Sequence, residues 1–350
     1  MKRKNIAITF AILAATLYAI NIPISKMLLV HVQPTMMAAF LYLGAGIGLL
    51  IYSLLHKMMG KPQTASPLTR KELPYTIAMV VLDIIAPILL MYGIVRTNAA
   101  NVSLLNNFEI VATSIIALVI FKEVISRRLW IAIVLVTLAS IVLSFDGADA
   151  FVFNQGSLFI LGACICWGFE NNCTKMISNK SSVEIVTIKG CFSGLGSLII
   201  ALLIGEHIPA VQWIFPVLIL GFVACGLSIT FYIMAQKEMG AAKTSAYYSI
   251  APFLGVLFSV VLLGERPSLQ FYIAFAIMAI STWFMIKDTI ALQHTHEHEH
   301  IHTHEHTHGD MTHTHQHIHH HEHIHVHGEE AENHMHPCDM NEEHQHTHNI

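Results

Sequence analysis

The sequence predicts an all-α membrane protein with ten transmembrane helices in two inverted five-helix repeats, followed by a disordered His-rich tail. Hydrophobic residues make up 54% of the 350 residues and charged residues 12%, whereas an ordinary soluble domain carries about 25% charge. A long apolar stretch also occurs twice. The segment beginning at Ala99 aligns without a gap with the segment beginning at Ala241, and Glu123 then matches Glu265. Such internal similarity indicates a duplicated chain.

A membrane-spanning helix needs about 20 mostly apolar residues, and ten segments of the chain meet this requirement. The first of them is too long for the apolar core of a signal peptide and lacks a cleavage site of small residues, so we expect it to be retained. In chain order, the predicted spans are Ile6–Val30, Thr35–Leu55, Tyr75–Val95, Asn98–Phe121, Leu129–Phe145, Ser157–Ile177, Val183–Ile204, Ile208–Met234, Ala241–Leu263 and Leu269–Ile286.

Lysine and arginine in the short loops predict the orientation of these spans. The N-terminal run Lys2–Lys4 is basic, and alternation then leaves only Arg96 and Arg266 in outer loops. Both termini are therefore predicted to be cytoplasmic, in a plasma (inner) membrane protein. An odd number of spans in each half inverts the second half, which is typical of transporters with a substrate site near the middle of the bilayer. The predicted domains are residues 1–146, 156–287 and a tail over 288–350.

The first spans of the two halves also match, because Asn21 aligns with Glu170 and Lys26 with Lys175. The run Asn21–Pro23 predicts a break or kink, since proline removes a helix hydrogen bond. Small-residue motifs in the second and seventh spans allow close approach of helix backbones. They could pack helices within the chain or form the face of a homodimer. The glycines of these motifs are Gly44, Gly48, Gly190 and Gly194.

These features resemble the EamA-type drug/metabolite transporters. The resemblance rests on ten spans in two copies, an Ala-Ala pair that opens the fourth and ninth spans, and a Glu that closes each of them. The ending Gly264–Pro267 fits that pattern, whereas the first copy has Lys122 in place of the glycine. The resemblance covers about residues 5–287. It implies a translocator with this fold and leaves the cargo open, since the superfamily moves amino acids, nucleobase-like metabolites, nucleotide-coupled sugars and toxic amphiphiles.

Charged side chains inside the predicted spans mark the candidate site, because an ionisable group at mid-bilayer costs at least about 2.5 kcal/mol. Three acids, Glu109, Glu170 and Asp83, occupy positions where the other repeat has no acid. We expect them, in this order, to carry cargo chemistry or proton coupling. The alternative is idle acids that are paired with Lys26, Lys175 or Lys189. The other predicted substrate or proton-coupling residues are Asn106, Asn107, Asn171, Trp167, Tyr247, Lys26 and Lys175.

Other charges in the spans have a matching partner in the other repeat. Glu123 and Glu265 are interpreted as helix-end acids that pair with nearby arginines close to the lipid headgroups. Lysines near the span ends can extend to the interface along their apolar stems. Shared architecture therefore explains these residues without a role in transport.

From His294 onward the chain alternates His with Thr, Glu, Ile or Gln, and 22 of its 25 His lie in the last 57 residues. This segment has no apolar periodicity and is predicted to be disordered. Imidazole suits zinc, nickel and copper, and binding should fade below about pH 6.5 because the ligands must be neutral. The predicted ligands of a zinc or nickel ion are His294, His296, His298, His300, His302, His304, His306, His308, His313, His315, His317, His319, His321, His323, His325 and His327.

The sequence contains no enzyme constellation, since it has neither a nucleotide-binding glycine loop nor a nucleophile with a base in reach. No cofactor is required, and no nucleic-acid partner is expected. We predict a secondary exporter of small metabolites or drug-like compounds that works by alternating access in the lipid bilayer. The alternatives are a transporter of zinc, nickel or cobalt fed by the tail, and a metal-sensing membrane protein that transports nothing. Against metal transport, no predicted span holds a His or a pair of acids at helical ligand spacing.

Overall fold

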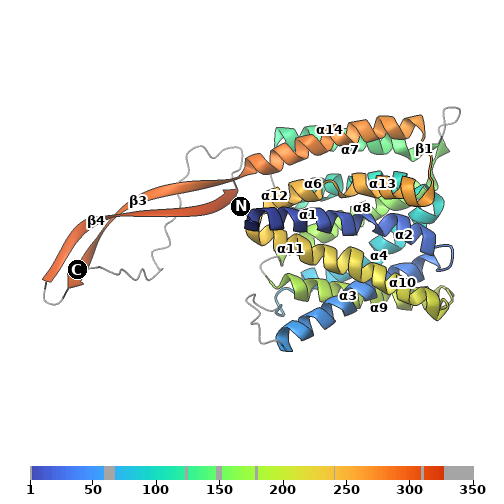
Figure 1. Ribbon diagram of the computed structural model, residues 1–350, viewed down its shortest axis with the longest axis horizontal. Coiled ribbons are helices and arrows are strands. Elements are labelled where there is room, and N and C mark those ends of the chain that lie inside the picture. Colours follow the sequence, from blue (N-terminus) through green and yellow to red (C-terminus); the bar gives the residue numbers. More distant parts are fainter. Residues whose placement is uncertain are drawn as a thin grey trace. The chain divides into compact units, whose positions relative to one another are not determined.

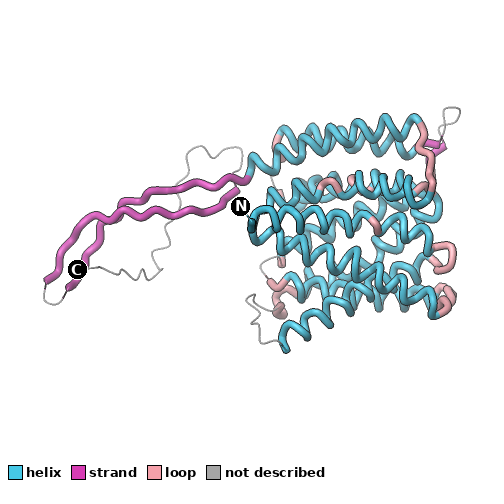
Figure 2. The backbone as a smooth tube through the Cα atoms, in the orientation of Figure 1, coloured by secondary structure: helices cyan, strands magenta, loops and turns pink. Residues whose placement is uncertain are grey.

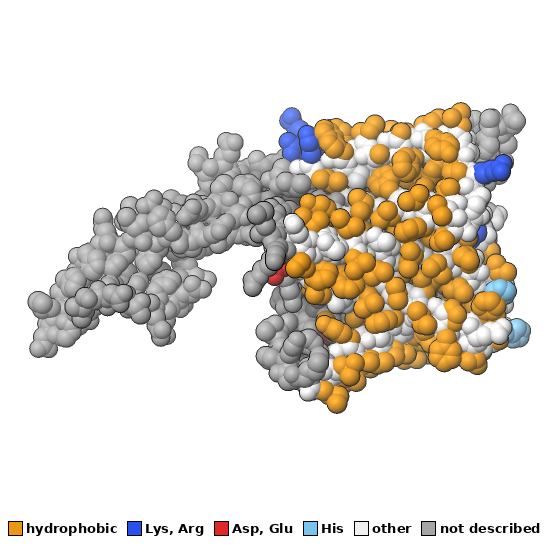
Figure 3. Space-filling model, viewed as in Figure 1, with side chains coloured by type: hydrophobic (Ala, Val, Ile, Leu, Met, Phe, Trp, Pro, Cys, Tyr) orange, Lys and Arg blue, Asp and Glu red, His pale blue; other side chains and the backbone are white. Residues whose placement is uncertain are grey.

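The computed structural model describes residues 2–58, 68–122, 125–146, 152–177, 180–239, 241–308 and 311–326. The chain divides into two units, Met1–Ala291 and Leu292–Ile350. The first unit is a bundle of helices that run roughly parallel to one common direction (Figures 1 and 2). On the face drawn in Figure 3, hydrophobic side chains cover the middle of this bundle and Lys or Arg side chains lie at its ends, as expected for a membrane domain.

All ten predicted spans are helical in the described residues. The first repeat contains α1 (Lys2–Ala19), α2 (Asn21–Leu28), α3 (Pro34–Met58), α4 (Leu73–Arg96), α5 (Ala99–Leu105), α6 (Phe108–Phe121) and α7 (Arg127–Ser144). A short antiparallel pair, β1 (Phe145–Asp146) and β2 (Val152–Phe153), precedes the second repeat. That repeat contains α8 (Gln155–Met176), α9 (Ser182–Leu203), α10 (Val211–Gly221), the π-helix η1 (Phe222–Leu227), α11 (Ser228–Met239), α12 (Ala241–Tyr248), α13 (Ala251–Leu263) and α14 (Leu269–Leu292).

In the described residues, eight helical segments are long enough and apolar enough to cross a membrane. The sixth and ninth predicted spans do not meet this requirement, and the structure shows why. Helix α8 is 22 residues long but carries the polar run Glu170–Asn172. The ninth span is divided between α12 and the shorter apolar helix α13. Polar residues and helix breaks inside spans are what a transport site requires.

Three predicted spans are interrupted near their middle. The first breaks at Ile20, between α1 and α2, close to the predicted break at Asn21–Pro23. Pro23 has no N–H to donate to the carbonyl of Ala19, so the helix cannot continue through this turn. The fourth span breaks at residues 106–107 and the ninth at residues 249–250. These two breaks fall at nearly equivalent positions of the repeated stretch, and the eighth span passes through the π-helical turn η1.

Close packing of α3 against the second repeat depends on glycine. A Cβ atom on Gly46 would lie 2.4 Å from the backbone nitrogen of Cys191 in α9, and one on Gly190 would lie 2.5 Å from Gly46. A Cβ atom on Gly44 would lie 2.1 Å from the carbonyl oxygen of Leu218 in α10. The small-residue motifs therefore pack helices within the chain, which is the first of the two roles that the sequence leaves open.

Helices of one repeat pack against helices of the other repeat. Helix α4 packs against α8, and α1 packs against α11, so the third span of each repeat lies along the first span of the other. The second spans, α3 and α9, pack against each other. Each repeat completes the core of the other, and the polar faces of α4, α8 and α9 meet between them.

The structure corrects the interpretation of Glu265. Its two carboxylate oxygens accept hydrogen bonds from the backbone N–H groups of Ala99 and Ala100, at 2.7 and 2.9 Å, where α5 begins. The first N–H groups of a helix lack partners within it, and the positive end of the helix dipole favours an anion. The Glu that closes the ninth span thus caps the Ala-Ala pair that opens the fourth. The equivalent Glu123 lies outside the described residues.

Glu206 ties the repeats together in the same way. Its carboxylate oxygens accept hydrogen bonds from the N–H groups of Thr35 (3.1 Å) and Met36 (2.7 Å) at the start of α3. Glu206 follows α9 in the second repeat, so both caps join a loop of one repeat to a helix start of the other. Neither contact has a sequence signature, because the partner is backbone.

We predict that Glu265→Ala lowers the free energy of unfolding by about 0.5–2 kcal/mol, the usual cost of losing a helix N-cap. Thermal unfolding of the purified protein in detergent measures this loss. Glu265→Gln keeps one oxygen acceptor and should cost less than the alanine variant. Equal melting temperatures for Glu265→Ala and the unchanged protein would contradict the cap.

Lys122 ends α6 in a left-handed conformation with φ of 55°, where the second repeat has Gly264 with φ of 64°. For a residue with a Cβ atom, this conformation is less favourable than for glycine by about 1–2 kcal/mol. We predict that Lys122→Gly raises the melting temperature and that Gly264→Ala lowers it. The same detergent unfolding assay compares the two variants, and an unchanged or lower melting temperature for Lys122→Gly would contradict the strain.

The second unit begins at Leu292, the last residue of α14. Its backbone forms a two-stranded antiparallel hairpin of β3 (Gln293–His308) and β4 (Met311–Val326), in a segment for which the sequence predicts disorder. The alternation of His with Thr, Glu and Ile has the period of a β-strand, although an isolated two-stranded hairpin is at best marginally stable in water. His327 and the residues after it lie outside the described part of the chain.

Candidate substrate site

A cavity of about 640 Å³ lies between the two repeats, within the range of about 300–1,000 Å³ that is usual for small-molecule sites. The interrupted spans supply much of its wall. Asn106 and Asn107 line it from the break in the fourth span, Ser249 from the break in the ninth, and Cys225 from η1. At a helix break, some backbone N–H and C=O groups lose their partners within the helix. The cavity is therefore polar where the spans are broken.

Lys189 of α9 bridges two of the three predicted acids. Its Nζ atom lies 3.0 Å from Oδ2 of Asp83 in α4 and 2.9 Å from Oε1 of Glu170 in α8. Both carboxylates are buried, and a buried charge is tolerated only with a partner. Lys189 is therefore the lysine that pairs with both of these acids.

Further hydrogen bonds hold this ion-pair cluster in place. Oδ1 of Asp83 accepts from the Tyr42 hydroxyl at 3.1 Å and from the Trp167 indole N–H at 3.2 Å. Thr174 donates its hydroxyl proton to Oε1 of Glu170. Lys189, Glu170, Tyr42 and Trp167 line the cavity, whereas Asp83 lies behind them and holds the lining side chains.

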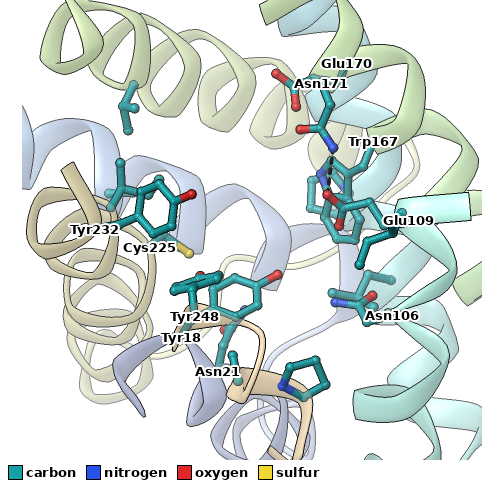
Figure 4. A pocket seen from close by; sticks show the side chains of 18 of the residues that line it. Tyr18, Asn21, Asn106, Glu109, Trp167, Glu170, Asn171, Cys225, Tyr232 and Tyr248 are labelled. Atoms are coloured by element: carbon teal, nitrogen blue, oxygen red, sulfur yellow. Dashed lines mark hydrogen bonds between the residues drawn. The ribbon is translucent and has the colours of Figure 1, made fainter. Parts of the chain in front are cut away.

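Glu109 has a different environment. It stands in the first turn of α6, directly after the helix break, and lines the cavity. Asn171 donates its amide N–H to Oε1 of Glu109 at 2.7 Å and also lies 3.2 Å from the Thr113 hydroxyl (Figure 4). Among the described side chains, no Lys or Arg lies within 4.0 Å of this carboxylate. Glu109 is thus an acid with an amide partner and no ion-pair partner in the described chain.

A group of tyrosines lies across the cavity from Glu109 (Figure 4). The rings of Tyr18 and Tyr248 are 6.0 Å apart, and Tyr232 meets Tyr248 edge-on at 5.1 Å. The Tyr232 hydroxyl is hydrogen-bonded to Ser245 at 2.7 Å. The cavity therefore presents an acid on one side and aromatic rings on the other.

The structure brings six of the ten predicted site residues to the lining of this cavity. Asp83 lies behind the lining, and Tyr247 and two lysines lie away from it. Asn106, Asn107, Asn171 and Trp167 line it together with Glu109 and Glu170. Tyr247 is 38% exposed and does not line the cavity, whereas its neighbour Tyr248 does. Successive residues of a helix point about 100° apart, so only one of the two can face inward.

The two repeat-matched lysines also lie away from the cavity lining. Lys26 donates to the carbonyl oxygens of Ile94 and Thr97 at the C-terminal end of α4, where a helix offers unpaired carbonyls to a cation. Lys175 is exposed in the last turn of α8. The structure thus gives Lys26 a capping role at the end of α4.

A family model described as the EamA-like transporter family matches residues 5–145 and 154–287. The chain belongs to this family. The two matched regions correspond to the two repeats, so the sequence resemblance is confirmed. As an EamA-like protein it is a multi-pass membrane transporter and not an enzyme.

Similar proteins agree with this assignment. A protein of Methanothermobacter thermautotrophicus (strain Delta H) described as an uncharacterized transporter is 23% identical over 275 residues, which cover 74% of this chain and 80% of that protein. A solved crystal structure with 14% identity has a TM-score of 0.58 and covers 83% of this chain and 98% of its own. At this identity the structural likeness concerns the fold alone.

Several side chains that line the EamA-like cavity were not predicted as site residues, among them Tyr18, Tyr42, Lys189, Tyr232 and Tyr248. A signal for Lys189 exists in the sequence. If the glycine motifs of α3 and α9 are aligned, Lys189 matches Leu41, and a lysine opposite leucine in a span is as unusual as the three unmatched acids. The tyrosines have no such signal, because aromatic residues in spans are commonly packing residues.

Proposed function

We propose that this EamA-like transporter exports small metabolites or drug-like compounds across the plasma membrane by alternating access, in exchange for protons. The observation that carries the proposal is the cavity between the repeats, with Glu109 as an acid that has no described ion-pair partner. Inverted repeats rock about such a central site. We further propose that both termini are cytoplasmic, as the loop charges predict.

Proton exchange is assigned to Glu109 rather than to Glu170. A carboxylate within a membrane-spanning segment is costly unless it is protonated or paired with a cation. Glu170 has Lys189 at 2.9 Å, whereas Glu109 is hydrogen-bonded by the neutral amide of Asn171. A neutral partner leaves Glu109 suited to take up a proton when the cavity is empty and to release it when substrate arrives.

Proteoliposomes that contain the purified protein and a pH-sensitive dye test this proposal. With a pH gradient imposed, addition of a transported compound should dissipate the gradient, and amino acids, nucleobases and amines can be screened in turn. Liposomes without protein provide the baseline. Substrate counterflow without any proton movement would reject the proton coupling and leave the transport proposal standing. If no compound class gave counterflow or dissipated the pH gradient, both transport and proton coupling would be rejected.

A second candidate function concerns the tail, for which we propose binding of zinc or nickel. In the backbone register of the hairpin, His294 is opposite His325 and His306 is opposite His313, and histidine is a residue type that suits these metals as a ligand. Within the side chains that the structure describes, there is no group of three His, Cys, Asp or Glu able to hold a metal ion. We therefore propose a metal buffer or regulator, with metal transport and a non-transporting sensor as alternatives.

A chain that stops after Leu292 tests the tail. This end point keeps α14 whole, whereas a stop after Lys287 would remove Asp288, whose buried carboxylate accepts a hydrogen bond from Ser126. We predict that the shortened protein loses zinc binding and keeps metabolite exchange. Isothermal titration with zinc and the proteoliposome assay give the two readouts. Zinc flux that depends on Glu109 would instead support the metal transporter.

A further inference from the structure

We propose that the substrate of this cavity is an organic amine with one positive charge and no carboxylate group. The inference rests on the proposed function and specifies its substrate class. It follows from the charges that line the cavity, from the groups that are already paired, and from the aromatic side chains opposite Glu109.

The first step is the balance of charge. Among the described Asp, Glu, Lys and Arg side chains, Glu109, Glu170 and Lys189 line the cavity, and Asp83 lies directly behind this lining. One ammonium is shared by two of the three carboxylates, and Glu109 is left without a cation. Opposite charges attract strongly in a medium of low polarity. The cavity therefore favours a ligand that brings one positive charge to Glu109.

The second step is the geometry around Glu109. Asn171 donates to Oε1, which leaves Oε2 to accept from a ligand. Asn106 and Asn107 line the same region, and the amide of Asn107 donates to the Leu104 carbonyl at 3.1 Å, which leaves its side-chain oxygen as an acceptor. An ammonium group, with its donors and no acceptor, matches a site that offers oxygen atoms.

The third step is the lack of a place for a carboxylate. Lys189 is the described cation at the cavity, and both of its acids lie within 3.0 Å. Helix starts at the breaks could hold an anion in other transporters. Here the first turn of α6 carries Glu109 itself, and the first turn of α13 contains Pro252, which has no N–H.

The fourth step is the opposite wall. Tyr18, Tyr232 and Tyr248 face the cavity across from Glu109, and Trp167 lines it on the acid side. Aromatic faces attract cations and pack against apolar bodies. Leu90, Met91 and Ile110 add apolar surface. These features fit an amine with an aromatic or aliphatic body and do not fit a bare divalent ion.

Three small molecules with the same ring and different charge test the proposal. They are phenylethylamine, a cation; phenylalanine, a zwitterion; and 3-phenylpropionate, an anion. Full-length protein in lipid nanodiscs is melted at increasing concentrations of each, because a ligand that binds the folded state raises the melting temperature. We expect a rise with phenylethylamine and none with the other two at equal concentration.

Glu109→Gln should weaken the apparent affinity for phenylethylamine by about tenfold or more, since it removes a charged hydrogen-bond acceptor. The control is Glu72→Gln. Glu72 is an acid outside the cavity that is hydrogen-bonded to Thr69, so its variant should bind as the unchanged protein does. The comparison of the three probes requires no variant and decides the question even where Glu109→Gln does not fold.

A melting shift with phenylalanine or phenylpropionate as large as that with phenylethylamine would overturn the proposal. No shift with phenylethylamine, or an unchanged shift in Glu109→Gln, would also overturn it. These outcomes differ from failure of the proposed function. Phenylalanine that dissipates a pH gradient would reject the amine class and keep transport, whereas amine binding without exchange of any compound would reject transport and keep the site.

Discussion

Lys189→Met is expected to destabilise the membrane domain by about 3–5 kcal/mol, because removal of one partner leaves buried charges uncompensated. In this protein the loss concerns two carboxylates at once. Asp83 is fully buried and Glu170 is 1% exposed, and the Lys189 ammonium is within 3.0 Å of both. A typical domain is stable by only about 5–15 kcal/mol. We therefore expect a sharp fall in the folded yield and in the melting temperature measured in detergent.

The control for this prediction removes the carboxylates together with the lysine. In Lys189→Met combined with Asp83→Asn and Glu170→Gln, no charge remains in the cluster, so most of the lost stability should return. Tyr42 and Trp167, which donate to Oδ1 of Asp83, can still donate to the amide oxygen that Asp83→Asn leaves in its place. If Lys189→Met alone melts like the unchanged protein, the ion pairs do not contribute as described and the cluster is not structural.

The fold was predictable because its main signals are local or periodic. Apolar length sets the spans, the repeated stretch sets the duplication, and Pro23 sets the first break. Contacts between a side chain and distant backbone were not predictable. Glu265 binds the N–H groups that open α5, and a backbone N–H looks the same in every sequence. The basic residues near Glu265 offered a plausible partner, and the structure shows the helix start in that role.

For the candidate site, the comparison of the two repeats found the acids but did not choose among Lys26, Lys175 and Lys189 as their partner. Glu109, Glu170 and Asp83 stood out because the other repeat lacks an acid at each position. Which lysine pairs with them depends on how α9 is rotated against α4 and α8, and this rotation is set by packing such as that of Gly46 on Gly190. Tyr247 was predicted in place of Tyr248 for the same reason, since one helix position changes which ring faces inward.

Glu109→Gln is expected to abolish proton movement coupled to the substrate, because glutamine neither binds nor releases a proton. In the proposed mechanism, a proton and a cationic substrate compete for this carboxylate. Substrate binding should therefore weaken as the pH falls and the carboxyl group is protonated, and strengthen as the pH rises. In Glu109→Gln the pH dependence should disappear. Proteoliposomes assayed over a range of internal and external pH, with dye fluorescence and labelled phenylethylamine measured together, give both quantities.

The Glu170→Gln variant distinguishes the role of Glu170 from that of Glu109, since the sequence left both acids as candidates for proton coupling. Glu170 is held by Lys189 and by the Thr174 hydroxyl, so its replacement should lower the melting temperature and leave the pH profile of exchange in place. Glu109 is hydrogen-bonded by Asn171, and its replacement should change the pH profile with a smaller loss of stability. A pH profile that flattens in Glu170→Gln and persists in Glu109→Gln would assign the proton to the ion-pair cluster, and Lys189 would then exchange partners during transport.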